Sequence, residues 1–271
     1  MIKLIACDLD GTIIRQDNTL SIENEMAIKL LEKKKITFLP CTGRCYQDMR
    51  SAFPQSLIYP SVLMNGALFA AANGSSIYHF PIKKDIVLDI VNYFQCIKLS
   101  TAIYSLNTIY MIGKISNFTK CLVECGMSED FAKEYYGCNI IEINSIGEIQ
   151  EDILKIEIMI ANTKVKNTCQ KFLSKCEDVN VSSSLPYNIE ITAKGIHKAA
   201  MLRKVAKFYG IKKEEILVFG DSMNDYELFE NYPNTVAPKN ADEAIIKLSK
   251  FQCETCENNG FSSFVRNYFK M

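Results

Sequence analysis

Apolar runs and amphipathic segments alternate along the first part of the chain. Residues 4–7 and 36–41 are short, nearly continuous apolar runs, which is the pattern of strands buried on both faces. Residues 21–35 carry apolar side chains at helical spacing, and a second helix is expected from Tyr46. A third apolar run lies at 61–64. This order of strand, helix, strand, helix and strand predicts a parallel sheet flanked by helices.

The first helix has a clear start signal. Ser21 is a suitable N-cap, and acidic residues follow it in the first turn, where they suit the helix dipole. We expect the helix to bury an apolar face made of Ile22, Met26, Ala27, Leu30 and Leu31.

The pattern changes in the middle of the chain. A helical stripe at 86–94 is followed by short β-type runs at 102–104 and 109–112. Residues 154–160 and 188–192 then alternate apolar and polar side chains, which is typical of strands with one buried and one solvated face. This part of the chain is therefore expected to form an antiparallel sheet covered on one side.

The last part of the chain returns to the first pattern. Lys198 begins a helix that ends at Gly210, and the apolar run 216–220 has the character of a parallel strand. Helical patterns at 242–248 and 261–269 complete the chain.

These patterns predict two domains, the second inserted into the first. The expected fold is α/β, with a Rossmann-like parallel-sheet core at 1–83 and 187–271 and an inserted α+β domain at 84–186. Strand 4–7 is expected at the centre of the core sheet, and Pro40 favours an edge or the end of its strand.

Polar clusters follow three of the predicted core strands. Asp8 and Asp10 follow the first, and Thr42 to Arg44 follow the second. Asp221 follows the strand at 216–220, with Asn224 and Asp225 shortly after it. Asp and Gly alone would fit an ordinary turn, but three such strand ends converge where open parallel sheets form sites. Paired carboxylates suit a hard cation such as Mg²⁺, which predicts metal-assisted phosphoryl transfer.

Composition narrows the function classes. Lys and Arg number 31, as do Asp and Glu, so there is no basic excess of the kind that nucleic-acid binders show. No apolar run is long enough to span a bilayer, and only four residues separate Lys3 from Asp8, too few for a signal peptide. The 11 cysteines show no disulfide framework. We expect a cytoplasmic protein without nucleic-acid or membrane partners; the sequence does not indicate its oligomeric state.

Four motifs resemble those of the haloacid dehalogenase superfamily, and most closely its Cof-type subfamily. They are Asp8-Leu-Asp-Gly-Thr12, Thr42-Gly-Arg44, the lysine that follows Lys194-Gly195, and Gly220-Asp-Ser-Met-Asn-Asp225. The resemblance covers the whole chain, with a large α/β cap (class IIB) between the second and third motifs. It implies a cap that closes over the leaving group and sets specificity.

The resemblance implies catalytic roles for two acids and a lysine. Asp8 would be the nucleophile that forms an aspartyl phosphate, and Asp10 would be the general acid and then the general base. To donate a proton near neutrality, Asp10 needs a raised pKa, which Asp8 favours and the metal and lysine oppose. Lys198, which begins a helix, fits the motif better than Lys194, although Ala199 stands where a glycine usually follows.

The resemblance also implies ligands for the phosphate and for Mg²⁺. The phosphate-binding groups would be the backbone amides of Leu9 and Gly43, with Thr42, Lys198 and Asn224. The metal ligands would be Asp8, the carbonyl of Asp10, and Asp221, Ser222 and Asp225. Arg44 fits a substrate contact and a structural ion pair equally well.

The function predicted from these motifs is a Mg²⁺-dependent phosphatase acting on small phosphorylated metabolites such as sugar phosphates. A phosphohexomutase is a second possibility, but only Ser222 and Met223 separate Asp221 from Asn224, where those relatives typically carry a longer insertion. A catalytically silent metabolite-binding protein on the same fold is the third.

Overall fold

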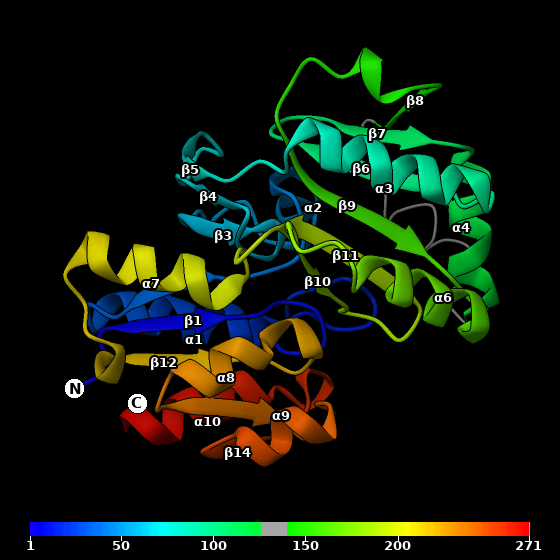
Figure 1. Cartoon of the computed structure of the whole chain (residues 1–271). Helices are drawn as coiled ribbons and strands as arrows, with labels where there is room; N and C mark the ends of the chain where they lie inside the picture. Colours follow the sequence, from blue (N-terminus) through cyan, green and yellow to red (C-terminus); the bar gives the residue numbers. More distant parts are fainter. Residues whose placement is uncertain (126–139, 271) are drawn as a thin grey trace. The chain divides into compact units, whose positions relative to one another are not determined.

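The computed structural model describes residues 1–125 and 140–270. The chain divides into two compact units, one of Met1–Tyr78 with His197–Met271 and one of His79–Ile196 (Figure 1). The second unit is therefore an insert, as predicted, but it begins before residue 84 and ends after residue 186. The difference at its end arises because strand β11 (Asn188–Ala193) pairs with β9 (Ile153–Met159) in the second unit's sheet.

The first unit contains a parallel five-stranded sheet with the order β14-β13-β12-β1-β2. Its strands are β1 (Leu4–Cys7), β2 (Thr37–Pro40), β12 (Ile216–Phe219), β13 (Thr235–Pro238) and β14 (Phe251–Cys253). Every residue of β1 and β12 is buried, so both faces of the sheet are covered, as the continuous apolar runs predicted. The α/β fold class is thereby confirmed.

Helices pack around this sheet in two groups (Figure 1). The helices are α1 (Ile22–Lys33), α2 (Tyr46–Ala52), α7 (Lys198–Tyr209), α8 (Tyr226–Asn231), α9 (Glu243–Leu248) and α10 (Gly260–Phe269). Helix α1 lies beside α10, whose Phe261 ring contacts Phe38 of β2 and Phe219 of β12. Helix α7 contacts α8, which contacts α9.

Two predictions about the core sheet are wrong in detail. Strand β12 occupies the central position, and β1 lies between β12 and the edge strand β2. The third apolar run joins the parallel sheet only through an isolated parallel bridge between Cys41, which follows β2, and Val62. It forms β3 (Ser61–Leu63) of a small sheet with β4 (Leu68–Ala70) and β5 (Ser76–His79), because the turn at Asn65-Gly66 folds β4 back antiparallel to β3. Pro40 is the last residue of an edge strand, as predicted.

The buried face of α1 also differs from the prediction. Ser21 caps the helix as expected, its hydroxyl accepting from the Asn24 amide at 3.1 Å. Ile22 and Met26 are exposed, at 72% and 52%, and the buried residues are Asn24, Ala27, Ile28 and Leu31. The buried Asn24 side chain donates to the Ile13 carbonyl and accepts from the Ser262 amide, so a polar residue connects the buried face of α1 to the loop after β1 and to α10.

The second unit contains a six-stranded sheet with the order β10-β11-β9-β6-β7-β8. Its remaining elements are α3 (Lys84–Cys96), β6 (Thr101–Ser105), β7 (Ile109–Ile112), α4 (Ile115–Glu124), β8 (Ile140–Ile143), α6 (Thr163–Leu173) and β10 (Val179–Ser182). All its pairs are antiparallel except β7 with β8. One face packs against α3 and α6 through an isoleucine-rich core that includes Ile103, Ile156 and Ile189.

The opposite face of this sheet is not the wet face that alternation predicted. Lys155 and Glu157 on β9 and Glu190 on β11 are at most 3% exposed. They lie in a network of hydrogen bonds and ion pairs, which compensates for their burial. Alternation indicated correctly which residues share a face, but not that the polar face is buried.

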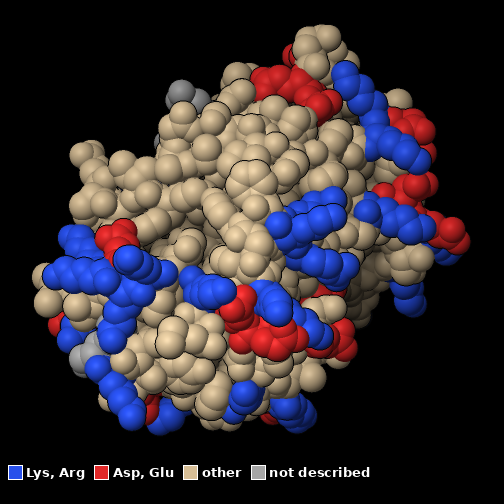
Figure 2. All heavy atoms as spheres, turned by 90° about the vertical axis from the view of Figure 1, so that its left-hand side faces the viewer, with Lys and Arg blue, Asp and Glu red and all other residues tan. Residues whose placement is uncertain are grey.

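Helices in residues 1–125 and 140–270 all lack the length and apolar character needed to cross a membrane. On the face shown in Figure 2, Lys and Arg side chains lie close to Asp and Glu side chains, in keeping with the equal numbers of basic and acidic residues.

Candidate active site

Three neighbouring strands of the first unit deliver the predicted site residues to one edge of the sheet. Asp8 follows β1, Thr42 follows β2, and Asp221 follows β12 after Gly220. Because β12, β1 and β2 are adjacent and parallel, their carboxyl ends lie side by side.

Lys198 connects these strand ends. It is the first residue of α7, and its side chain is fully buried. Its ammonium donates to Asp8 Oδ1 at 2.6 Å, Asp225 Oδ1 at 2.8 Å and Asn224 Oδ1 at 3.2 Å. Lys194, the alternative suggested by the sequence, is exposed.

The loop after β12 holds Asp225 in place. Asp225 Oδ2 accepts from the backbone amides of Asp221 at 3.1 Å and Ser222 at 3.4 Å, while the Ser222 hydroxyl donates to Asn224. A Cβ at Gly220 would lie 2.6 Å from Asp225 Cγ, so the loop requires glycine there. Both carboxylate oxygens of Asp225 therefore accept hydrogen bonds from the protein, Oδ1 from Lys198 and Oδ2 from the two amides.

Asp221 is fixed from the β1 side. The Thr12 hydroxyl donates to Asp221 Oδ1 at 2.6 Å. Gly11 has a φ of +75°, and a Cβ there would lie 2.5 Å from Asp221 Oδ2. Glycine is therefore needed at position 11 for two reasons: it adopts a positive φ without strain, and it leaves room for the Asp221 carboxylate.

The crowding of these acids raises two of their pKa values. Burial raises the pKa of Asp8 to about 7, and Asp225 and Asp10 add to this effect, although Lys198 opposes it. Burial and the neighbouring Asp8 and Asp225 also raise the pKa of Asp221 well above its usual value. The site thus holds more negative charge than Lys198 alone compensates.

This crowding fits a divalent cation. One carboxylate oxygen from each of Asp8, Asp221 and Asp225 lies within 4.8 Å of the others. Hard cations prefer oxygen ligands, and a positive charge here would offset the repulsion among the acids. Asp10 is not in this group through its side chain. The Ser222 hydroxyl donates to Asn224 Oδ1 at 2.9 Å.

The Asp10 side chain instead pairs with Arg44. Arg44 Nε donates to Asp10 Oδ2 at 2.9 Å, and a terminal guanidinium nitrogen donates to Asp10 Oδ1. The guanidinium also binds Asp48 and Asn18, so Arg44 is part of a structural ion-pair network. Desolvation raises the pKa of Asp10, but Arg44 outweighs it and holds the net pKa below its usual value. This is opposite to the raised pKa that the general-acid role led us to expect, because the sequence did not indicate that Arg44 reaches Asp10.

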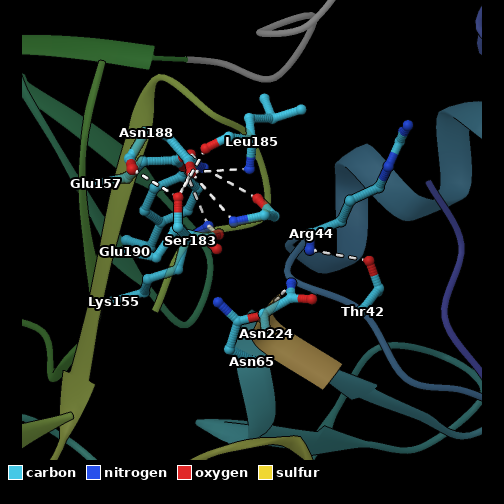
Figure 3. A network of polar contacts seen from close by, with 12 residues as sticks. Thr42, Arg44, Asn65, Lys155, Glu157, Ser183, Leu185, Asn188, Glu190 and Asn224 are labelled. Atoms are coloured by element: carbon cyan, nitrogen blue, oxygen red, sulfur yellow. Dashed lines mark hydrogen bonds and ion pairs between the residues drawn. The ribbon is translucent and has the colours of Figure 1, made fainter. Parts of the chain in front are cut away.

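The predicted phosphate-binding residues lie after β1, β2 and β12 and at the start of α7. Thr42 is fully buried, and its hydroxyl accepts from the Arg44 amide at 3.2 Å (Figure 3). Gly43 lies between these two residues in the chain. The Leu9 side chain is buried in the core, which leaves only its backbone for a ligand.

Sequence reasoning missed Asn65 as a member of this cluster. Asn65 is buried, in a left-handed conformation with φ of 54°, and accepts from Asn224 Nδ2 at 3.1 Å (Figure 3). It thereby fixes the amide orientation of Asn224, whose oxygen faces Lys198. In the sequence, Asn65-Gly66 is a typical turn pair, but its spacing does not link it to Asn224.

The fold and the site together define a Rossmann-like α/β protein with an inserted domain and an acidic site at the carboxyl ends of its strands. Residues 5–265 match the sequence profile described as haloacid dehalogenase-like hydrolase. The chain therefore belongs to this family, and the resemblance predicted from the four motifs is confirmed.

Curated relatives match over nearly their full length. The phosphatase YwpJ of Bacillus subtilis is 26% identical, with 98% of this chain and 99% of YwpJ covered. The 5-amino-6-(5-phospho-D-ribitylamino)uracil phosphatase YcsE of the same organism is 27% identical, with 98% and 96% covered.

Solved structures share the fold. A haloacid dehalogenase-like hydrolase from B. subtilis superimposes with a TM-score of 0.89 at 25% identity, over 98% of this chain and 99% of that one. The HAD subclass IIB sugar phosphatase BT4131 gives a TM-score of 0.81 at 18% identity, over 99% and 100%, and supports the fold alone.

Proposed function

We propose that this protein is a Mg²⁺-dependent phosphatase that hydrolyses monoesters of small phosphorylated metabolites, including sugar phosphates, through an aspartyl phosphate on Asp8. The observation that carries the proposal is the buried contact of Lys198 with Asp8 and Asp225, beside Asp221. The relatives named as phosphatases support the same reaction.

The proposed first step is attack of an Asp8 carboxylate oxygen on phosphorus. The bond between phosphorus and the ester oxygen breaks, and the leaving oxygen takes a proton from Asp10. Lys198 orients Asp8 and offsets charge on the phosphoryl oxygens, with Thr42 and nearby backbone amides as further donors. Bound Mg²⁺ would supply charge neutralisation to the phosphoryl group and would be held by Asp8, the Asp10 carbonyl, Asp221 and Asp225.

The second step returns the enzyme to its starting state. Asp10 accepts a proton from water, whose oxygen attacks phosphorus, and the bond between phosphorus and Asp8 breaks to release phosphate. Asp10 must leave its ion pair with Arg44 to act in either step, and its half-exposed side chain, at 51%, has room to do so. The pair with Arg44 favours the ionised Asp10 that accepts a proton from water, so Asp10 holds the proton that it donates in the first step only while it is out of this pair.

The relatives suggest a substrate class. YcsE is named for a substrate with a phosphorylated ribityl chain, which is a polyhydroxylated phosphate monoester as sugar phosphates are. We propose this shared class for the present protein, with the second unit selecting the leaving group.

The proposal is tested with p-nitrophenyl phosphate, which needs no particular leaving-group recognition. Wild-type protein with Mg²⁺ is expected to release p-nitrophenol, and EDTA is expected to abolish turnover. Asp8→Asn should lower kcat at least about a thousandfold because the nucleophile is lost. Asp89→Asn, an exposed acid on α3, is the matched control and should leave kcat unchanged. Turnover by Asp8→Asn at the wild-type rate would refute the assignment.

A further inference from the structure

Two cysteines lie one helical turn apart at the end of α4 in the inserted unit (Figure 1). Cys121 belongs to the last turn of this helix, and Cys125 is its C-cap. The Cys125 amide donates to the Cys121 carbonyl at 3.1 Å, so the α-helical turn between them is closed. Residues four apart lie on the same side of a helix, and the two thiols are therefore neighbours.

Both thiols are free, partly exposed and close enough to influence each other. Burial raises the pKa of Cys121 to about 11, and the neighbouring Cys125 thiol adds to the rise. Burial also raises the pKa of Cys125, while a hydrogen bond with the Cys121 thiol opposes the rise. Both cysteines therefore carry a proton at neutral pH.

The spacing of the two cysteines suits a bridging ion better than a disulfide. Cβ atoms four residues apart on a helix are about 5–6 Å from each other. A disulfide needs Cβ atoms about 3.5–4.5 Å apart, so it would require the helical turn to distort. Metal–thiolate bonds of about 2.3 Å, by contrast, hold the two sulfurs of a linear site about 4.6 Å apart. An ion between the sulfurs therefore leaves the turn intact.

The number and type of ligands favour a soft ion that accepts two bonds. Thiolates select soft cations, Cu⁺ among them, whereas structural Zn²⁺ sites use four ligands. Within residues 1–125 and 140–270, three or more His, Cys, Asp or Glu ligands converge only at Asp8, Asp221 and Asp225. Two thiols without a third such ligand in this part of the chain fit Cu⁺ better than Zn²⁺.

The neighbours of the two thiols are compatible with thiolates. The Ala161 backbone amide donates to the Cys121 sulfur, which stabilises its ionised form. Glu124 opposes ionisation of both thiols, but its carboxylate lies 3.7 Å from the Lys120 ammonium, which offsets its charge. Burial and the two thiols raise the pKa of Tyr187 to about 12, so its hydroxyl stays neutral and adds no negative charge.

We propose that Cys121 and Cys125 form a two-coordinate binding site for Cu⁺. Each thiol loses its proton to solvent as its sulfur bonds to the ion, so one Cu⁺ replaces two protons and no electron is transferred. Because both sulfurs lie on one helical turn, the second binds at a high effective concentration. The pair should therefore hold Cu⁺ at least about a hundredfold more tightly than either thiol alone.

Anaerobic titration with Cu⁺, in competition with bathocuproine disulfonate, tests the site. Cys121→Ser and Cys125→Ser should each lose one equivalent of the Cu⁺ that the wild-type protein binds. Cys96→Ser removes a single exposed thiol at the end of α3 and is the control, which should lose none. Wild-type binding that neither variant of the pair weakens, or that Cys96→Ser weakens equally, overturns the proposal.

Two measurements on the wild-type protein need no variant to fold. One equivalent of Cu⁺ should protect Cys121 and Cys125 together from iodoacetamide, as mapped by mass spectrometry, while Cys96 stays reactive. Protection of Cys253 and Cys256 instead would place the ion at another pair and overturn the assignment. Affinity for the protected site should rise about a hundredfold from pH 6.5 to 7.5, because two protons are displaced; a rise of only about tenfold would contradict two thiolate ligands.

Discussion

Lys198 carries its charge in a fully buried position between Asp8 and Asp225. Burial lowers its pKa, but Asp225 and Asp8 raise it further, so the net pKa lies well above the usual value. Removing the ammonium would leave the two carboxylates without their shared partner. At pH 8 without metal, Lys198→Met is expected to lower the free energy of unfolding by about 3–5 kcal/mol, measured by urea denaturation.

Lys194→Met is the control, because Lys194 is exposed and was the competing candidate in the sequence. It should change the free energy of unfolding by no more than about 0.5 kcal/mol and leave hydrolysis intact. Equal stability of the two variants would contradict the buried ion-pair account.

For single residues, the sequence indicated which side chains belong to the site more reliably than which side chains they contact. Asp8, Asp221 and Asp225 were identified because acids after buried strands are hard to explain otherwise, and the structure brings them together. The pairing of Arg44 with Asp10 could not be read from spacing, since the two residues lie in separate loops, after β2 and after β1. The same holds for Asn65 and Asn224, which are far apart in the chain.

The loop after β1 gives a prediction at the scale of elements. Gly11 and Gly210 both have positive φ, but a Cβ at Gly210 would meet nothing within 4 Å. Each alanine substitution should cost about 1–2 kcal/mol from the backbone alone. Gly11→Ala should also displace Asp221 and weaken Mg²⁺ binding at least about tenfold, measured by calorimetric titration, since a misplaced carboxylate ligand loses its bond.

Gly210→Ala provides the matched comparison, because it closes α7 away from the carboxylates. It should share the loss of stability and keep wild-type Mg²⁺ affinity. If both alanine variants bind Mg²⁺ equally well, the close approach of Gly11 to Asp221 has no functional role.

Helices and strands could be predicted because each has its own spacing of apolar residues along the chain. Helix α3 buries the predicted stripe, and β1 and β12 are the predicted buried strands. The face of α1 and the wet face of β9 were mispredicted for one reason: polar residues such as Asn24 and Glu157 are buried where they find partners. Periodicity counts apolar residues and contains no information about such partners.

The balance of charge at the acidic site predicts how the whole molecule responds to pH and metal. The pKa of Asp8 is raised to about 7 in the folded state, so folding favours the protonated form. The associated stability is present in full below the unfolded-state pKa and is lost as pH rises through about 7. Without metal, the free energy of unfolding of Asp8→Asn should therefore rise relative to that of wild type from pH 5 to pH 8, measured by urea denaturation.

Mg²⁺ should reverse this difference at pH 8, because it binds the ionised carboxylates of the wild-type protein and stabilises the folded state. Asp8→Asn, with one carboxylate fewer, should gain less from Mg²⁺. Parallel stability curves for the two proteins, with and without metal, would exclude Asp8 as the titrating group and as a metal ligand.

At the scale of the whole molecule, an inserted unit was predictable from the change in hydrophobic pattern. Its limits were not, because β11 follows the predicted boundary and yet pairs with β9. The choice of partner strand depends on contacts distant in sequence, which local patterns do not record.

The most direct test of the central claim is to trap the aspartyl phosphate. In Asp10→Asn, ³²P-labelled p-nitrophenyl phosphate should still phosphorylate Asp8, since its leaving group needs no protonation, while hydrolysis of the intermediate is slowed. Acid quenching should then give labelled protein that hydroxylamine releases, with the label on the peptide containing Asp8. Label that persists when Asp8→Asn is added to this variant, or turnover without any labelled protein, would contradict the account.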